Sequence, residues 1–156
     1  MEAAGRLRKA LQRHAVVGLD TVVFIYQYED NPAYAPLTEA IFDLVEGGRI
    51  KAVTSTLTLM EVLVNPKRKG KQDLVEDYTY ALTTFPNLEM KTVDAFVAEE
   101  AAGLRARYNL RPPDAIQVTA CLLGGADVFV TNDDAMKKVK EIKVLSLKDF
   151  IDSTHS

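Results

Sequence analysis

Short apolar runs that alternate with amphipathic segments are the feature that most constrains how this chain folds. The runs with the length and composition of buried strands are HAVVGLD, IKAVTS, LEMKTV, DVFVT and IKVLSL. Segments between them repeat apolar residues at helical spacing, as in AYAPLTEAIFDLVEGG and DAFVAEEAAGLRARYN. Strands that alternate with helices build βαβ units, whose strands are parallel. The order therefore predicts an α/β fold with a parallel sheet.

Proline and glycine predict where several helices begin and end. The segment PDAIQVTACLLGG begins with proline and ends with glycine, an asymmetry typical of helices. In STLTLMEVLVNP, Pro66 is the expected end, because proline cannot continue the hydrogen-bond pattern of a helix. Leu57, Met60 and Val64 recur there at helical spacing, so we expect them on the buried face.

The length and composition of the chain fit one globular domain. The chain has 156 residues, of which 47% are hydrophobic and 26% charged. No apolar run approaches the roughly 20 residues of a membrane span, so no membrane partner is expected. We expect a single domain over residues 1–156, with a helical extension at residues 1–14 and a core at residues 15–151. The one cysteine, Cys121, lies among apolar residues, which fits a buried thiol in a cytoplasmic protein.

Four acidic residues stand where an α/β sheet gathers its chemistry. Asp20 closes the first strand run, and Asp133 comes shortly after the fourth. Side chains at the carboxyl ends of parallel strands converge on one edge of the sheet. Asp114 lies in the first turn of a helix that leads to such a strand. Glu61 interrupts the apolar segment LTLMEVLV, where a charge is costly unless it is paired.

Each of these acids also has an ordinary structural explanation. Asp114 suits the positive end of a helix dipole, and Asp133 or Asp134 could cap the DAMKKVK helix. Glu61 could face solvent or pair with a lysine, whereas Asp20 has only apolar runs on both sides. As a set, the acids would repel one another unless a cation lay among them. A set of oxygen ligands suits Mg²⁺ or Mn²⁺.

Other chemistries lack residues that they require. A phosphatase of the haloacid dehalogenase type needs a second aspartate where this chain has Val22. The sequence contains no GxxxxGK[ST] or GxGxxG loop to bind the phosphates of a nucleotide. A serine or cysteine nucleophile needs a histidine base, and the only histidines, His14 and His155, lie near the termini. The acids are therefore the strongest candidates for chemistry.

Several blocks of the sequence resemble the PIN domain family, small nuclease domains best known from VapC-type toxins of prokaryotic toxin-antitoxin pairs. The blocks occur in the family's order from about Val16 to Ile151 and are VVGLDTVVFIY, STLTLMEVL, PPDAIQVTACLLGGADVFVTND and IKVLSL. The resemblance implies a three-layer α/β/α sandwich with a mostly parallel central sheet of about four to five strands. The chain departs from the family at Val22, where serine or asparagine is frequent, and at Gln117, where histidine is frequent.

The resemblance also implies a site and a reaction. It assigns catalytic and metal-binding roles to Asp20, Glu61, Asp114 and Asp133. Thr131 matches the family's common threonine before the last acid, and Asp134 lies beside the pattern as a supporting residue. The implied activity is metal-dependent endonucleolytic hydrolysis of RNA, with Mg²⁺ or Mn²⁺ as the cofactor.

The expected partners follow from charge and from the resemblance. A net charge of −3 gives no overall attraction for nucleic acid, so RNA must be held by local cations. The candidates for these cations are Arg105, Arg107, Arg111, Lys67 and Arg68. The resemblance further implies a homodimer and an antitoxin partner. The alternative is a catalytically weak PIN-like module that binds RNA or protein in an RNA-processing or regulatory complex.

Overall fold

The computed structural model describes residues 2–152 and contains a five-stranded parallel sheet. The strands are β1 (Val16–Leu19), β2 (Lys51–Ser55), β3 (Leu88–Lys91), β4 (Val128–Thr131) and β5 (Lys143–Ser146). Their order across the sheet is β3-β2-β1-β4-β5. The predicted α/β fold with a parallel sheet is confirmed. His155, one of the two histidines considered above, lies outside the described residues.

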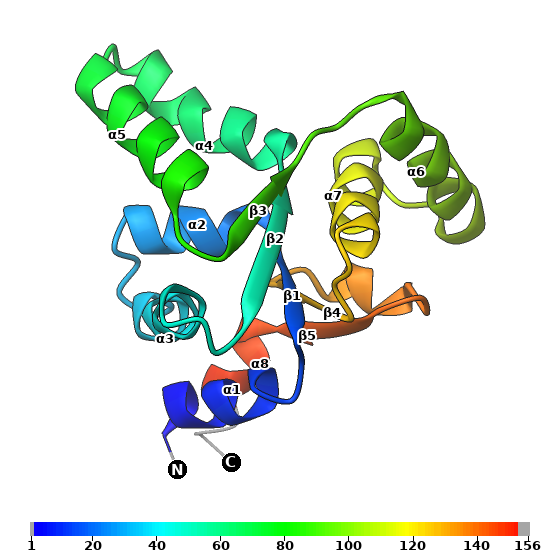
Figure 1. Cartoon of the computed structure of the whole chain (residues 1–156), viewed down its shortest axis with the longest axis horizontal. Coiled ribbons are helices and arrows are strands. Elements are labelled where there is room, and N and C mark those ends of the chain that lie inside the picture. Colours follow the sequence, from blue (N-terminus) through cyan, green and yellow to red (C-terminus); the bar gives the residue numbers. More distant parts are fainter. Residues whose placement is uncertain (1, 153–156) are drawn as a thin grey trace.

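Helices cover both faces of the sheet, which gives the molecule three layers (Figure 1). They are α1 (Ala3–Leu11), α2 (Thr21–Tyr28), α3 (Ala35–Glu46), α4 (Thr56–Arg68), α5 (Gln72–Thr84), α6 (Ala95–Tyr108), α7 (Pro112–Leu123) and α8 (Leu147–Asp152), with a 3₁₀ helix, η1 (Asp134–Lys138). One hydrophobic cluster packs α1, α2 and α3 against one face, and a second packs α6, α7 and η1 against the other. Among the helices described, none is both long and apolar enough to cross a membrane.

Side chains on β4 alternate between the two clusters. Val128 and Val130 belong to the first cluster and Phe129 to the second, and all three are fully buried. Burial on both faces is typical of strands in parallel sheets, and it explains why this strand has consecutive apolar residues. Burying one such side chain stabilises the fold by about 1.5–3 kcal/mol.

Helix α7 lies close against β1 because Gly18 has no side chain. A Cβ atom added at Gly18 would lie 2.8 Å from the Cβ atom and 3.0 Å from the Sγ atom of Cys121. Cys121 is fully buried, as expected, and burial raises the pKa of its thiol. This close packing of α7 on β1 brings Asp114, in the first turn of α7, to the edge where β1 ends.

The N-terminal segment also packs on the fold through α1. Leu7 and Leu11 are fully buried in the first hydrophobic cluster. The Arg6 guanidinium donates a hydrogen bond of 2.5 Å to the carbonyl oxygen of Phe150 in α8. Helices near the two ends of the chain therefore lie side by side (Figure 1).

The end and the buried face of α4 differ from the sequence-based expectation. The helix continues past Pro66, because only one hydrogen bond is lost when proline occupies the last turns. Thr58, Val62 and Pro66 are buried, whereas Met60 is 57% exposed and Val64 is 38% exposed. Contacts with α5, α2 and α7 decide which face is buried, and those contacts bury a stripe that includes a threonine.

Candidate active site

A cleft at the carboxyl edge of the sheet contains all four predicted acids. It has a volume of about 370 Å³ and is called the acidic cleft below. Its lining includes Asp20, Thr21, Glu61, Arg111, Asp114, Thr131 and Asp133. The acids come from four separate parts of the chain: the end of β1, helix α4, helix α7 and the loop after β4. The fold therefore brings together side chains that are far apart in the sequence.

Asp20 is an acid of the cleft whose carboxylate is largely buried. One carboxylate oxygen caps α2 by accepting from the backbone N–H of Thr21 at 2.8 Å, and the other accepts from Thr131 Oγ1 at 2.7 Å. Burial raises the pKa of Asp20 from 3.8 to about 6, opposed by these two hydrogen bonds. The negative charges of Asp114 and Glu61 raise the pKa further. An ionised carboxylate here lacks a compensating positive charge.

Thr21 joins two of the acids, although the sequence reasoning did not single it out. Its backbone N–H binds Asp20, and its hydroxyl donates to Glu61 Oε1 at 2.6 Å. Thr21 is only 6% exposed, so this polar side chain is buried where apolar packing would be the default. Its position next to a strand-end aspartate was the available signal. Glu61 is therefore oriented toward the cleft by a neighbour of Asp20.

Asp114 carries a salt bridge with Arg111. The Arg111 guanidinium donates from Nε to Asp114 Oδ2 at 2.9 Å and from Nη2 to Oδ1 at 3.3 Å. The same Nη2 atom lies 4.0 Å from Asp133 Oδ2. These acids raise the pKa of Arg111, with the Asp114 hydrogen bond as the largest cause. Arg111 thus supplies a positive charge shared by two acids.

Asp133 lines the cleft and also begins η1. Its Oδ1 atom accepts from the backbone N–H of Ala135 at 2.9 Å. Its own backbone N–H donates to Thr131 Oγ1 at 3.2 Å. Thr131, which is fully buried, therefore connects the loop of Asp133 with the carboxylate of Asp20. Capping and cleft lining are compatible roles for Asp133.

The donor chemistry of the cleft fits a divalent cation, but the side chains do not close around a common point. Within residues 2–152, no three acidic, histidine or cysteine side chains are arranged to hold a metal ion. Each acid is instead bound to a donor of the protein, as described above.

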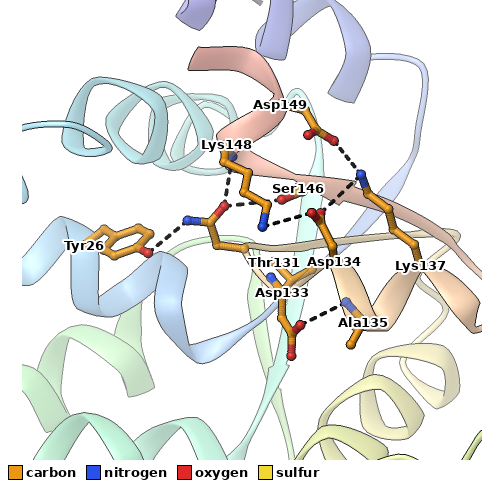
Figure 2. A network of polar contacts seen from close by, with 10 residues as sticks. Tyr26, Thr131, Asp133, Asp134, Ala135, Lys137, Ser146, Lys148 and Asp149 are labelled. Carbon is orange, nitrogen blue, oxygen red and sulfur yellow. Dashed lines mark hydrogen bonds and ion pairs between the residues drawn. The ribbon is translucent and has the colours of Figure 1, made fainter. Parts of the chain in front are cut away.

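The side chains of Asp133 and Asp134 point in different directions, and Asp134 faces Lys148 and Lys137 (Figure 2). Its carboxylate binds Lys148 Nζ at 2.9 Å and Lys137 Nζ at 3.3 Å, and Lys137 also binds Asp149 at 2.7 Å. These four residues, here called the lysine network, connect η1 with α8. Lys148 and Lys137 lower the pKa of Asp134, mainly through the Lys148 bond. Asp134 is not among the residues that line the cleft.

The predicted substrate-binding cations do not gather in one place. Arg111 lines the cleft. Arg105 donates from Nε to the carbonyl oxygen of Leu110 at 2.9 Å, and Arg107 pairs with Glu141. Lys67 and Arg68 are exposed in the last turn of α4, outside the cleft lining.

Comparison with known proteins identifies a family. The model of the PIN domain family matches residues 17–142 of the chain. A search among curated proteins found no match.

Several solved structures share the fold of this chain. A toxin-antitoxin complex from Klebsiella pneumoniae is 21% identical, with a TM-score of 0.63, and the match covers 84% of this chain and 97% of that one. VapBC2 from Rickettsia felis bound to a DNA fragment from their promoter is 14% identical, with a TM-score of 0.65 and coverage of 84% and 98%. FitAB bound to an IR36 DNA fragment is 15% identical, with a TM-score of 0.64 and coverage of 84% and 94%.

Proposed function

Because this chain belongs to the PIN domain family, we propose that it is a metal-dependent endoribonuclease that hydrolyses phosphodiester bonds in RNA. The observation that carries the proposal is the convergence of four acids from separate parts of the chain on one cleft. Arg111 is the one basic side chain among the described residues that line it. Such an excess of carboxylates is unfavourable without a bound cation.

We propose that a Mg²⁺ or Mn²⁺ site is formed by Asp20, Glu61, Asp114 and Asp133. Oxygen ligands without cysteine or histidine suit these ions. When bound, the cation supplies Lewis acidity and neutralises charge that develops on the scissile phosphate. The raised pKa of Asp20 supports the proposal, because a buried carboxylate beside two other acids gains most from a nearby cation.

The remaining polar residues of the cleft orient the acids and the substrate. Thr131 and Thr21 hold the Asp20 carboxylate by two hydrogen bonds, which fixes the direction of its free lone pairs. Arg111 is 73% exposed, so its guanidinium is accessible to a phosphate of the substrate. Arg105, Arg107, Lys67 and Arg68 lie outside the cleft lining and would contact RNA farther along the strand.

We further propose that the chain is the toxin of a toxin-antitoxin pair, acting in the cytoplasm as a homodimer. The support is the fold, which is shared with a structure described as a toxin-antitoxin complex and with VapBC2 and FitAB bound to DNA. The partner would be an antitoxin protein that restrains the nuclease. We also propose that residues 1–156 form a single domain.

A second candidate is a catalytically weak PIN-like module that binds RNA or protein in an RNA-processing or regulatory complex. One observation favours it: within the described part of the chain, the acids are not arranged closely enough to hold a metal. Such a module would bind RNA without cutting it. An assay of RNA cleavage therefore distinguishes the two candidates.

The test is cleavage of labelled single-stranded RNA, with DNA of matched sequence, in Mg²⁺, Mn²⁺ or EDTA. We expect wild-type protein to cut RNA in Mg²⁺ or Mn²⁺ only, and Asp114→Asn to lose the activity. Asp134→Asn is the matched control, because Asp134 is a nearby acid outside the cleft lining. Folded wild-type protein that binds RNA but cuts nothing would establish the binding module instead.

A further inference from the structure

A buried polar cluster lies behind Glu61 and is not explained by the reaction itself. Its members are Thr21, Thr54, Ser55, Thr58 and Gln117, all at most 6% exposed. Buried hydroxyl and amide groups are costly unless each one finds a hydrogen-bond partner. The cluster joins α2, α4, α7 and β2, and it contacts the cleft through Thr21.

The directions of the threonine hydrogen bonds are determined by two acceptors. Thr21 Oγ1 donates to Glu61 Oε1 at 2.6 Å, and Thr54 Oγ1 donates to the carbonyl oxygen of Leu19 at 2.9 Å. A hydroxyl group has one proton, so these two hydroxyls accept all their other bonds. Thr58 Oγ1 lies 2.7 Å from Thr54 Oγ1 and 3.0 Å from Thr21 Oγ1, so its single proton is donated to one of these two acceptors.

Gln117 has the donors and the acceptor that this arrangement requires. Its Nε2 atom carries two protons and lies 2.6 Å from Thr58 Oγ1 and 3.3 Å from Thr21 Oγ1. Its Oε1 atom accepts from the hydroxyl of Ser55. All three threonine protons point away from Gln117, so the group that faces them must donate.

We propose that Gln117 is a positioning residue for the acidic cleft, and this inference rests on the proposed function. By donating to Thr21, Gln117 leaves the Thr21 proton directed at Glu61, which holds that carboxylate in the cleft. A carboxamide does not titrate, so Gln117 acts by orientation alone. Groups that orient ligands in this way typically change metal affinity about 10-fold or more when removed.

The proposal predicts different effects for different substitutions of Gln117. Gln117→Met fills similar space but offers neither the donors nor the acceptor. Gln117→Glu offers acceptors to hydroxyls that have no free proton, and it buries a charge. Gln117→His keeps one N–H donor and one acceptor nitrogen in the neutral imidazole. We therefore expect Gln117→His to retain most of the function that Gln117→Met loses.

The test is calorimetric Mn²⁺ binding to the full chain, with melting temperature and RNA cleavage measured in parallel. We expect Thr21→Val and Gln117→Met each to weaken Mn²⁺ binding about 10-fold, and Gln117→His to remain within about threefold of wild type. The control is Thr119→Val, because Thr119 is a buried threonine of the same helix whose hydroxyl has no hydrogen-bond partner among the described residues.

The double variant separates positioning from general loss of packing. If Gln117 acts through Thr21, Thr21→Val with Gln117→Met weakens binding about 10-fold, as each single change does, because coupled residues are not additive. An effect of about 100-fold would indicate independent contributions and overturn the inference. If the wild type binds Mn²⁺ and Gln117→Met binds it equally well, this inference is overturned but the proposed function is not. Wild-type protein that neither binds Mn²⁺ nor cuts RNA overturns the proposed function as well.

Discussion

Two neighbouring groups of charges differ in how they are balanced. The lysine network has two carboxylates, Asp134 and Asp149, and two ammonium groups, Lys137 and Lys148. The acidic cleft has four carboxylates in its lining, with Arg111 as the one basic side chain among its described lining residues. The pKa of Asp134 is lowered by its lysines, whereas the pKa of Asp20 is raised to about 6 by burial. The lysine network is balanced within itself, whereas the four carboxylates of the acidic cleft share one arginine, and this excess of negative charge suits a further cation.

The largest difference between the two groups should appear in RNA cleavage. Asp133 and Asp134 are adjacent in the sequence but belong to different groups. We expect Asp133→Asn to slow cleavage by about 100-fold or more. The substitution removes a negative charge that would hold the cation, and the transition state requires that cation to neutralise the scissile phosphate. We expect Asp134→Asn to change the rate by less than about twofold, since surface ion pairs contribute little. Equal losses of RNA cleavage in the two variants would contradict the distinction between the acidic cleft and the lysine network.

Asp20 should make the metal-free protein less stable as the pH rises. Its pKa is 3.8 in the unfolded chain and about 6 in the folded protein, so the folded state binds more protons in this interval. Stability from this group is fully present below pH 3.8 and is lost as the pH rises through about 6. The loss at pH 7 is on the order of 2–3 kcal/mol.

The measurement for Asp20 is urea unfolding in EDTA at several pH values. We expect Asp20→Asn to be more stable than wild type at pH 7 and to lose that advantage near pH 4. Mn²⁺ should stabilise the wild type and leave Asp20→Asn largely unchanged. An Asp20→Asn variant that is less stable than wild type at every pH would show that the ionised Asp20 carboxylate does not destabilise the fold.

Arg111 should compete with a metal ion for Asp114 and Asp133. We expect Arg111→Gln to bind Mn²⁺ about fivefold more tightly at low salt, because the substitution removes a positive charge that repels the cation. The same variant should cut RNA more slowly, since a phosphate contact is lost. Arg107→Gln is the control for Mn²⁺ binding, because Arg107 pairs with Glu141 outside the cleft lining. Unchanged Mn²⁺ affinity in Arg111→Gln would argue against competition.

The lysine network should give the smallest effect. Lys148→Met removes one of the two lysines bound to Asp134. The side chains of the lysine network are largely solvated, so we expect the melting temperature to fall by only about 2–4 °C at most. Mn²⁺ affinity should not change, which calorimetry can check. A marked change in Mn²⁺ affinity would show that the lysine network influences the acidic cleft.

The gathering of the acids was predictable because it depends on a simple rule of parallel sheets. Strands that run in one direction end at one edge, so Asp20 after β1 and Asp133 after β4 were expected to meet. Asp114 followed from the proline that begins α7. The different directions of Asp133 and Asp134 were not predictable, because they depend on how η1 leaves the sheet and on lysines of other elements.

Other features depended on contacts between distant parts of the chain. The bond between Gln117 and Thr21 joins residues 96 positions apart, and no local pattern indicates it. The exposure of Met60 and the burial of Thr58 reverse the usual preferences of these residue types. Helix α4 places Thr58 against the buried polar cluster, so tertiary contacts override the apolar periodicity.

The most direct test of the central claim is Mn²⁺ binding by calorimetry to wild-type protein and to single variants of the four acids. The variants are Asp20→Asn, Glu61→Gln, Asp114→Asn and Asp133→Asn, with Asp134→Asn as the control. We predict that each of the four weakens binding by about 10-fold or more, while the control stays within about twofold of wild type. Binding that survives two or more of these changes, or that falls equally in the control, would contradict a single cation site in the acidic cleft.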